Sequence, residues 1–403
     1  MTRRRLLRTA ASLGAIAVST SVLEACGAGA ATGTTSAPGV TRLPTRTSVP
    51  SPTGTATPPP TPTATRPPSP TPSATATASP TAEPSATPAA SATPDAAATA
   101  AAAGMARVAF VKTNDRAGGV RRALALLGVN PARGENVRLK PNFNSADPPP
   151  GSTHPDVLRS LVQELWDWGA KSITVADRSG MGDTRRVMEQ KGVLDLAREL
   201  GLETIVLDDL ELNDWVMQQP HDSHWEKGFP LARLFLEGPT VQTCCLKTHR
   251  YGGHFTMSLK NSVGMVAKFD PGGGYNYMSE LHGSPHQRSM IAEINAAYAP
   301  ALVVMDGVEA FTTGGPDTGK RVAPEVVLAA TDRVALDAVG VALLRYFGTT
   351  PEVSRGTIFQ QEQIARAVEL GLGVTGPDEI QLITDDEDSA AYAGEISALL
   401  AQG

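Results

Sequence analysis

The sequence predicts an α/β fold with a mainly parallel sheet flanked by helices, preceded by a disordered segment rich in Pro, Thr, Ala and Ser. Short apolar runs alternate with longer amphipathic stretches, as in folds that cover a parallel sheet with helices. The runs are apolar at consecutive positions, which is typical of strands buried on both faces. No Phe, Trp or Tyr occurs before Phe110, so a packed core is expected only beyond that point.

The predicted elements follow one another from residue 107 to residue 384. Strands are expected over residues 107–112, 136–140, 172–177, 204–209, 240–247, 301–306, 326–331 and 380–384. Helices are expected over residues 119–128, 154–169, 183–201, 285–299 and 332–348. The helix at 154–169 has five apolar residues at helical spacing on one face and Thr153 as its expected N-cap.

Residues 1–26 have the features of an export signal. MTRRRLLR resembles the twin-arginine motif, and the apolar stretch after it is too short and too polar to span a bilayer. LEAC (23–26) resembles a lipoprotein cleavage box with Cys26 as the lipidated residue, although Glu24 replaces the usual small residue. We therefore expect the twin-arginine machinery and the membrane as partners, and a location on the extracytoplasmic face of the cell membrane. A secreted protein is the alternative if Cys26 is not lipidated.

Residues 27–104 are mostly Ala, Thr, Pro and Ser. Such a segment cannot bury enough apolar surface to offset its ordering entropy, and its prolines favour extended polyproline II. We interpret it as a tether that holds the domain away from the membrane. A ligand for a proline-binding module and an O-glycosylated stalk are the alternatives.

The remaining residues, 105–403, have ordinary globular composition and are enough for one large domain or two small ones. We expect a single α/β domain there. Residues 1–104 carry seven Arg against three acidic residues, so the whole-chain charge of −6 leaves −10 on residues 105–403. This charge argues against nucleic-acid binding. Cys244 and Cys245 are the cysteines of this part, and no CxxC occurs, so a cysteine-bound cluster or zinc site has no ligands.

The stretch CLKTHRYGGHFTMSLKNSVG (245–264) gathers basic residues beside a Gly-Gly pair. No Asp or Glu occurs between positions 238 and 269, although the domain is acidic. We interpret the stretch as a strand end, a turn at Gly252-Gly253, and a helix over 257–267 capped by Thr256. This arrangement predicts a local anion pocket near a helix N-terminus.

Four predicted strands end in charged residues, namely Lys140, Asp177, Lys247 and Asp306. Ligands of open parallel sheets bind beyond the carboxyl ends of the strands, so we expect one shared site there. The expected ligand-binding residues are Lys140, Asn142, Thr153, His154, Lys260 and Asn261. The residues expected to carry chemistry are Lys247, His249, Asp177 and Asp306, with lysines as point charges and Asp and His as acid–base groups.

Metal binding is a separate hypothesis. Asp177, His249 and Asp306 form a possible carboxylate–imidazole set for a divalent metal, whereas the His221/His224 and His282/His286 pairs are weaker candidates. The sequence contains no P-loop, GxGxxG or GxSxG motif, so it identifies no cofactor.

The landmarks resemble the domain-of-unknown-function 362 family. The matching stretches are LKPNFN (139–144), THPDVLRSLVQELWDWGAKSITVADRSG (153–180), LKTHRYGGHFTMSLKNSVGMVA (246–267), VMDGVEAFTTGGPDTG (304–319) and ATDRVALDAVG (330–340). Many family members carry an added ferredoxin-like segment that this chain lacks. The resemblance implies no settled activity.

Three functions therefore stay open at this point. The first is binding or transformation of a small anionic molecule at the Lys/Asp/His residues, and the second is a metal- or cofactor-binding, redox-associated role. The third is a non-catalytic surface lipoprotein. The sequence does not decide whether the protein is an enzyme.

Overall fold

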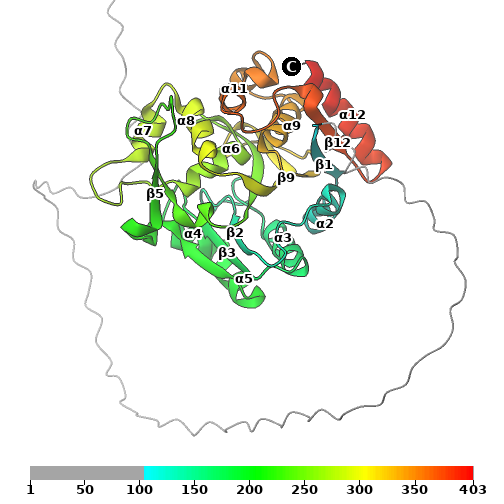
Figure 1. Ribbon diagram of the computed structural model, residues 1–403. Helices are drawn as coiled ribbons and strands as arrows, with labels where there is room; N and C mark the ends of the chain where they lie inside the picture. The colour runs from blue at the N-terminus through cyan, green and yellow to red at the C-terminus, as the bar shows by residue number, and fades with distance from the viewer. Residues whose placement is uncertain (1–103, 403) are drawn as a thin grey trace, which may run out of the picture. The chain divides into compact units, whose positions relative to one another are not determined.

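The computed structural model describes residues 104–402, which form a ten-stranded mixed sheet with helices on both faces (Figure 1). The predicted α/β fold is confirmed. The strands are β1 (Ala106–Lys112), β2 (Asn136–Lys140), β3 (Ser172–Asp177), β4 (Glu203–Val206), β7 (Thr240–His249), β8 (His254–Thr256), β9 (Pro300–Gly314), β10 (Gly319–Val322), β11 (Val326–Ala330) and β12 (Ile380–Ile383). A separate two-stranded sheet pairs β5 (Trp215–Gln218) with β6 (Phe229–Ala232).

The order of strands across the main sheet is β12-β1-β11-β9-β7-β2-β3-β4. Strands β9, β7, β2, β3 and β4 pair in parallel, and so do β1 and β12. β11 joins these two groups by antiparallel pairing, while β8 and β10 form hairpins with β7 and β9. The carboxyl ends of β9, β7, β2 and β3 consequently lie at one edge of the sheet.

Helices cover each face of the sheet over its own apolar core. The first face carries α2 (Arg116–Leu127), α3 (Pro155–Asp167), α4 (Thr184–Gln190) and α5 (Val193–Leu200). The second carries α6 (Ser258–Asn261), α7 (Tyr277–Gly283), α8 (Gln287–Ile294), α9 (Arg333–Tyr346), α10 (Pro351–Ser354), α11 (Glu362–Glu369) and α12 (Glu387–Gln402). In Figure 1 the last helix, α12, lies close to β1 and β12, which it contacts.

Two predicted helices differ from the structure. The one expected over 183–201 is divided into α4 and α5 at Gly192, whose φ of 70° is left-handed. The one expected over 257–267 is only the short α6 followed by a 3-10 turn, and Thr256 does not cap it. The carboxylate of Asp337 instead accepts the backbone N–H groups of Ser258 and Leu259, at 2.8 and 2.9 Å. The helix N-terminus expected to bind an anion is therefore occupied by a side chain of the protein itself.

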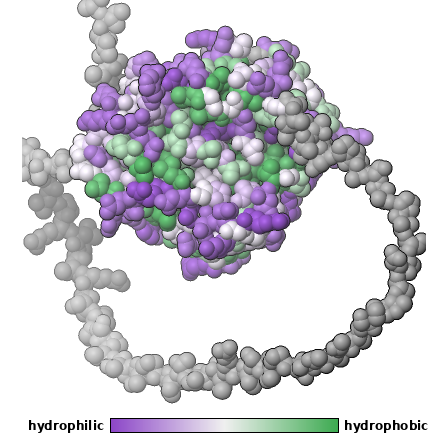
Figure 2. Space-filling view, viewed as in Figure 1, coloured by the Kyte–Doolittle hydropathy of each residue, from purple (hydrophilic) through white to green (hydrophobic). Residues whose placement is uncertain are grey.

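Two further observations concern the surface and the ends of the chain. Figure 2 shows hydrophilic side chains over most of the face in view, with apolar ones in small separate patches. In the part that the structure describes, no helix is long and apolar enough to cross a membrane. The predicted signal segment, Cys26 and the tether through residue 103 lie outside the described residues.

Candidate functional site

Four adjacent strands deliver charged side chains to one edge of the sheet. Lys140 ends β2 and Asp177 ends β3, whereas Lys247 and Asp306 lie inside β7 and β9, which continue further than predicted. All four are buried. Their contacts divide the edge into three groups with different chemistry.

The first group is a buried polar network, called here the inner network, made of Lys140, Asn142, Asp177, Lys247 and Asn261. Lys140 Nζ lies 2.6 Å from Asp177 Oδ1 and donates to Asn261 Oδ1 at 3.2 Å. Burial raises the pKa of Asp177, and the Lys140 ammonium and the backbone N–H groups of Phe143 and Arg178 oppose that rise. Both carboxylate oxygens of Asp177 are therefore hydrogen-bonded within the protein, to Lys140 and to the backbone just beyond β2 and β3.

Lys247 completes the inner network from the next strand. Its Nζ donates to Asn142 Oδ1 at 2.9 Å and to the carbonyl oxygen of Gly151 at 2.5 Å. Asn142 is fixed in turn, because its backbone N–H donates to Thr153 Oγ1 at 2.8 Å and its Nδ2 lies 3.4 Å from Asn261 Oδ1. Thr153 thus orients Asn142 and is not the N-cap of α3. The donors of the inner network are directed at protein acceptors.

The second group surrounds Asp306. Arg116 Nε donates to Asp306 Oδ2 at 2.9 Å, and the other end of the same guanidinium contacts Glu309 at 3.0 Å. Burial raises the pKa of Asp306, which Arg116 opposes. His154 is the N-cap of α3, since its Nδ1 accepts from the backbone N–H of Asp156 at 3.1 Å. The Arg116–Asp306 contact therefore joins α2 to the sheet edge, whereas the His154 contact lies within the first turn of α3.

The third group consists of four basic side chains and is called here the basic cluster. Its members are Arg178, His249, Lys260 and His282. Lys260 is 9% exposed, and its Nζ has no hydrogen-bond partner among the described residues. His249 is 7% exposed, and its buried Nδ1 likewise has no partner there. A Cβ on Gly253 would lie 2.7 Å from Lys260 Cε and 3.0 Å from His249 Nδ1, so the two side chains are neighbours.

Arg178 and His282 complete the basic cluster. Arg178 is held by its Nε and Nη2, which donate to the carbonyl oxygens of Val266 and Val263 at 2.7 and 2.5 Å. Its Nη1 is buried with no partner in the described chain. His282, on α7, is at the exposed rim, with Nδ1 2.7 Å from the carbonyl oxygen of Met278. The basic cluster therefore has unused N–H groups, which the inner network does not.

Electrostatics within the basic cluster favour loss of protons. Burial lowers the pKa of Lys260 to about 7, and the positive charges of Lys247 and Arg178 act in the same direction. Burial also lowers the pKa of His249 well below its usual range, assisted first by the charge of Lys260. Partial burial and the charge of Lys260 lower the pKa of His282. At neutral pH, a pKa of about 7 leaves Lys260 partly in its neutral form beside a neutral imidazole.

The Gly252-Gly253 turn packs directly against the basic cluster. Gly252 has a φ of 80°, which favours glycine, and its carbonyl oxygen accepts from Arg288 at 2.8 Å. The carbonyl oxygen of Gly253 accepts from Gln363 Nε2 at 2.5 Å. Helices α8 and α11 thus fix the turn at a position where a side chain on Gly253 would collide with Lys260 and His249.

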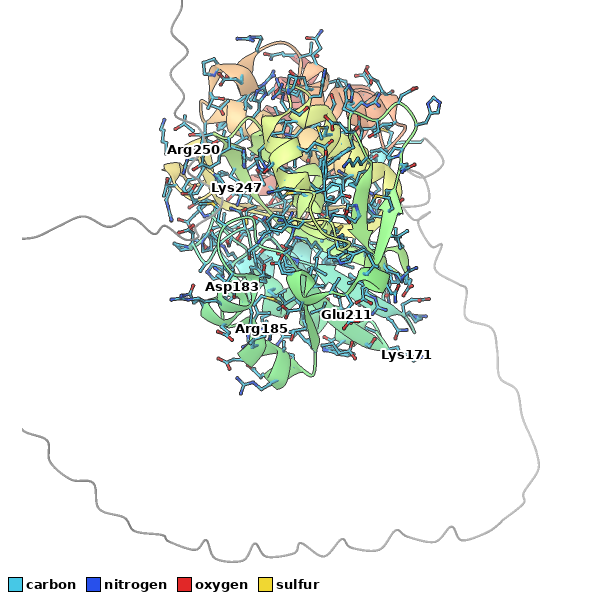
Figure 3. All side chains as sticks on the ribbon, turned by 90° about the vertical axis from the view of Figure 1, so that its left-hand side faces the viewer. Lys171, Asp183, Arg185, Glu211, Lys247 and Arg250 are labelled. Carbon is cyan, nitrogen blue, oxygen red and sulfur yellow. The ribbon has the colours of Figure 1, made fainter. Side chains whose placement is uncertain are left out.

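A second contact ties this turn to the β9–β10 hairpin. Arg250 Nη2 lies 2.9 Å from Asp317 Oδ1, and its Nη1 lies 3.3 Å from the carbonyl oxygen of Gly315. Figure 3 shows Lys247 inside the domain and Arg250 nearer the edge on the same side. Arg250 therefore serves the hairpins and is not a member of the basic cluster.

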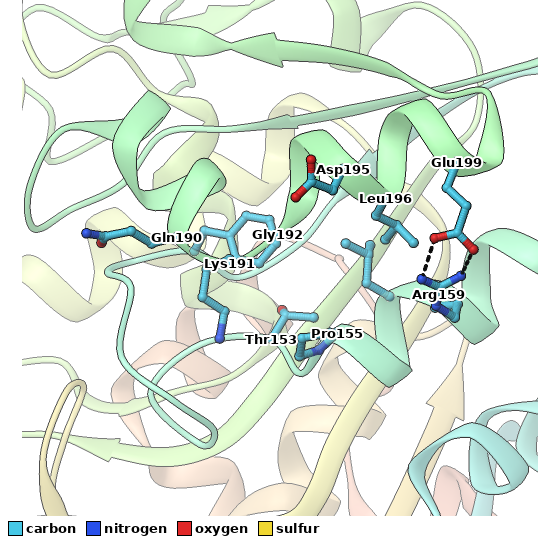
Figure 4. A pocket seen from close by; sticks show the side chains of 11 residues that line it. Thr153, Pro155, Arg159, Gln190, Lys191, Gly192, Asp195, Leu196 and Glu199 are labelled. Atoms are coloured by element: carbon cyan, nitrogen blue, oxygen red, sulfur yellow. Dashed lines mark hydrogen bonds and ion pairs between the residues drawn. The ribbon is translucent and has the colours of Figure 1, made fainter.

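A cavity of about 310 Å³ lies outside the three groups, between α3 and the α4–α5 segment (Figure 4). Its apolar lining includes Phe143 and Leu196, and its polar lining includes Lys191 and the Arg159–Glu199 ion pair. Of the predicted site residues it touches only Thr153. Since the polar groups named here have partners, the unused donors of the basic cluster are the stronger evidence for a ligand.

The structure does not bring together the residues considered for a metal. Among the described residues, no group of three or more His, Cys, Asp or Glu is arranged to hold a metal ion. Asp177 is paired with Lys140 and Asp306 with Arg116, while His249 faces Lys260. His224 is bound to Glu293 at 2.6 Å. The carboxylates thus have cationic side chains as partners.

Comparison with known proteins identifies the family. The profile of the family described as Domain of unknown function (DUF362) matches residues 137–342, just over half of the chain. The chain belongs to the DUF362 family. The Thylakoid-associated protein sll1697 of Synechocystis sp. (strain ATCC 27184 / PCC 6803 / Kazusa) is 27% identical over 258 residues, covering 61% of this chain and 74% of that protein. No solved structure matches the chain.

All members of the inner network and the basic cluster lie inside the DUF362 match. Sequence reasoning did not place Arg178 among the site residues and considered His282 only as a weak candidate for metal binding. Arg178 directly follows Asp177 at a strand end, and all seven histidines lie between positions 154 and 286, so both carried a usable signal. The sequence gives no signal for the role of Asp337, because this residue lies on a helix distant in sequence from the helix end that it caps.

Proposed function

We propose that this DUF362 domain binds a small molecule bearing a carboxylate or phosphate at the basic cluster. The observation that carries the proposal is Lys260, whose side chain is only 9% exposed and whose Nζ has no hydrogen-bond partner among the described residues. Arg178 contributes a second unused donor, Nη1, and the neutral imidazole of His249 lies beside Lys260. A small anion is the ligand that satisfies several such donors at once.

The physical basis is the cost of burying charge without a partner. A buried cation is strongly unfavourable unless it is paired, and otherwise its pKa shifts until it becomes neutral. Asp177 offsets part of this cost for Lys140, whereas the charges that act on Lys260 are those of other cations. A bound anion would supply the missing counter-charge and would return the pKa of Lys260 toward its usual value.

Within this proposal the predicted site residues divide into two roles. Lys260 and His249 contact the ligand, and Lys260 exchanges a proton with it because its pKa is near 7. The inner network and Thr153 hold the strand ends next to these two residues, through Lys140, Asn142, Asp177, Lys247 and Asn261. Asp306 has the same positioning role at β9, and His154 has it at α3. Chemical transformation of the ligand is proposed at Lys260 and His249 only.

Titration calorimetry of the full chain with inorganic phosphate and with oxalate tests the proposal. Lys260→Met is expected to weaken binding about tenfold to a hundredfold, the usual value of one charge-assisted hydrogen bond. Lys171→Met is the matched control, because this exposed lysine precedes β3 at the other end of the strand, far from Lys247 in Figure 3. Equal affinities for parent and Lys260→Met would refute the proposal.

We also propose that the domain is exported by the twin-arginine machinery and anchored through a lipid on Cys26. The motifs MTRRRLLR and LEAC support this, and the relative named as thylakoid-associated supports a location beside a membrane. Cys26→Ala is expected to move the protein from the membrane fraction to the soluble fraction. Retention of the variant in the membrane fraction would exclude the anchor.

A further inference from the structure

The basic cluster contains one lysine that is equipped to act as a nucleophile. A lysine amine attacks carbon only when it is neutral, and enzymes produce the neutral form by desolvation next to another cationic group. Lys260 meets both conditions, since its side chain is largely buried beside Gly253 and His249 and the charges of Lys247 and Arg178 act on it. Its Nζ is free, because no acceptor among the described residues holds it.

The other buried lysines of this region are committed to acceptors. Lys140 Nζ contacts Asp177, Asn261 and a backbone carbonyl, and Lys247 Nζ donates to Asn142 and another carbonyl. A nitrogen whose hydrogens are directed at fixed acceptors is poorly placed to attack carbon. All three lysines are buried, and Lys260 is distinguished from the other two by the geometry of its unpaired Nζ.

We infer that Lys260 forms an imine with the aldehyde or ketone carbonyl of a small oxo acid, whose acidic group is bound by Arg178. This inference rests on the proposed anion site and names its substrate class, a carbonyl compound bearing a carboxylate or phosphate. Arg178 suits the acidic group, because its Nε and Nη2 are fixed by carbonyl oxygens while Nη1 is unused.

The reaction balances without an oxidant or reductant. The lone pair of Lys260 Nζ attacks the carbonyl carbon, forming a C–N bond while the C=O π electrons move to oxygen, which takes a proton. The resulting carbinolamine loses its hydroxyl group with one further proton as water, and the C=N bond forms. His249 is neutral and adjacent, so it accepts the proton that leaves nitrogen and returns one to the departing oxygen. Amine and carbonyl thus give imine and water.

Reductive trapping tests the inference. The full chain is incubated with glyoxylate or pyruvate and sodium cyanoborohydride, and the product is followed by intact-mass and peptide mass spectrometry. One equivalent of secondary amine is expected on Lys260, with saturable kinetics and with competition by oxalate, which has the charges but no aldehyde or ketone. Lys171→Met should be trapped like the parent, and Lys260→Met should lose the adduct.

The outcomes separate this inference from the proposed function. If oxalate binds to the parent but no adduct forms on Lys260, the imine is wrong and the anion site stands. If oxalate does not bind either, both are wrong. Adducts spread over surface lysines and unchanged in Lys260→Met would also overturn the inference. Lys260→Arg, which keeps a positive charge but lacks the nucleophilic amine, should not be trapped, and its folding is checked by circular dichroism.

Discussion

Replacing Lys260 with Met is predicted to stabilise the fold at neutral and acidic pH. Lys260 is buried among cations without an acceptor, so its charge opposes folding, whereas a Met side chain fills similar space without a charge. Most core substitutions destabilise proteins, which makes an increase in stability a distinctive result. Binding sites are places where such a cost is retained for function.

The magnitude follows from the pKa. Burial lowers the pKa of Lys260 from 10.5 to about 7, and one pKa unit corresponds to about 1.4 kcal/mol, so the upper limit is on the order of 4–5 kcal/mol. Below pH 7 the folded and unfolded chains both carry the proton, and the full penalty is present. Between pH 7 and 10.5 the unfolded chain binds more protons, so stability of the parent rises with pH. The advantage of Lys260→Met should therefore shrink over that interval.

Denaturant unfolding at several values from pH 6 to pH 10, followed by tryptophan fluorescence, measures the difference. Buffers should lack phosphate and carboxylates, because a bound anion would relieve the penalty in the parent. A free-energy difference that stays constant with pH, or a destabilised variant at pH 6, would refute the reasoning about Lys260.

Three further predictions concern its surroundings. Lys140→Met should destabilise the fold by about 3–5 kcal/mol in denaturant unfolding, because it leaves the buried Asp177 carboxylate without its cationic partner; a loss below about 1 kcal/mol would contradict this. Gly253→Ala should weaken oxalate binding about tenfold in calorimetry, because the added Cβ would lie 2.7 Å from Lys260 Cε. Its circular dichroism spectrum should match that of the parent. An unchanged affinity for oxalate would contradict this geometry. Burial raises the pKa of Asp337 from 3.8 to about 7. Between pH 3.8 and about pH 7 the folded chain therefore binds a proton at Asp337 that the unfolded chain has lost. The stability of the fold should consequently fall as the pH rises through this interval. Asp337→Asn should remove that slope in thermal unfolding, and parallel curves for parent and variant would show that another group is responsible.

The sequence predicted the sheet well because its strands are continuous apolar runs. All eight predicted strands are present, since such runs are stable only when buried on both faces. Strands β5 and β6 were missed because they are short and one contains Pro230, a residue that argues against a strand. Helix α12 was missed because small residues dominate it and its apolar stripe is weak.

The gathering of charged residues at one edge of the sheet was predictable, and their division into three groups was not. The strand-end rule identified Lys140, Asp177 and Lys247, because parallel strands bring their carboxyl ends together. Whether a lysine at that edge is paired depends on partners distant in sequence, such as Asn142 for Lys247. The helix end expected to bind the anion is closed by Asp337, a contact that no local pattern encodes.

A crystal structure of the protein with oxalate tests the central claim most directly. The account predicts one oxalate within hydrogen-bond distance of Lys260 Nζ and Arg178 Nη1, with His249 beside it. Ordered water alone between these nitrogens, with oxalate bound elsewhere or not at all, would contradict the account.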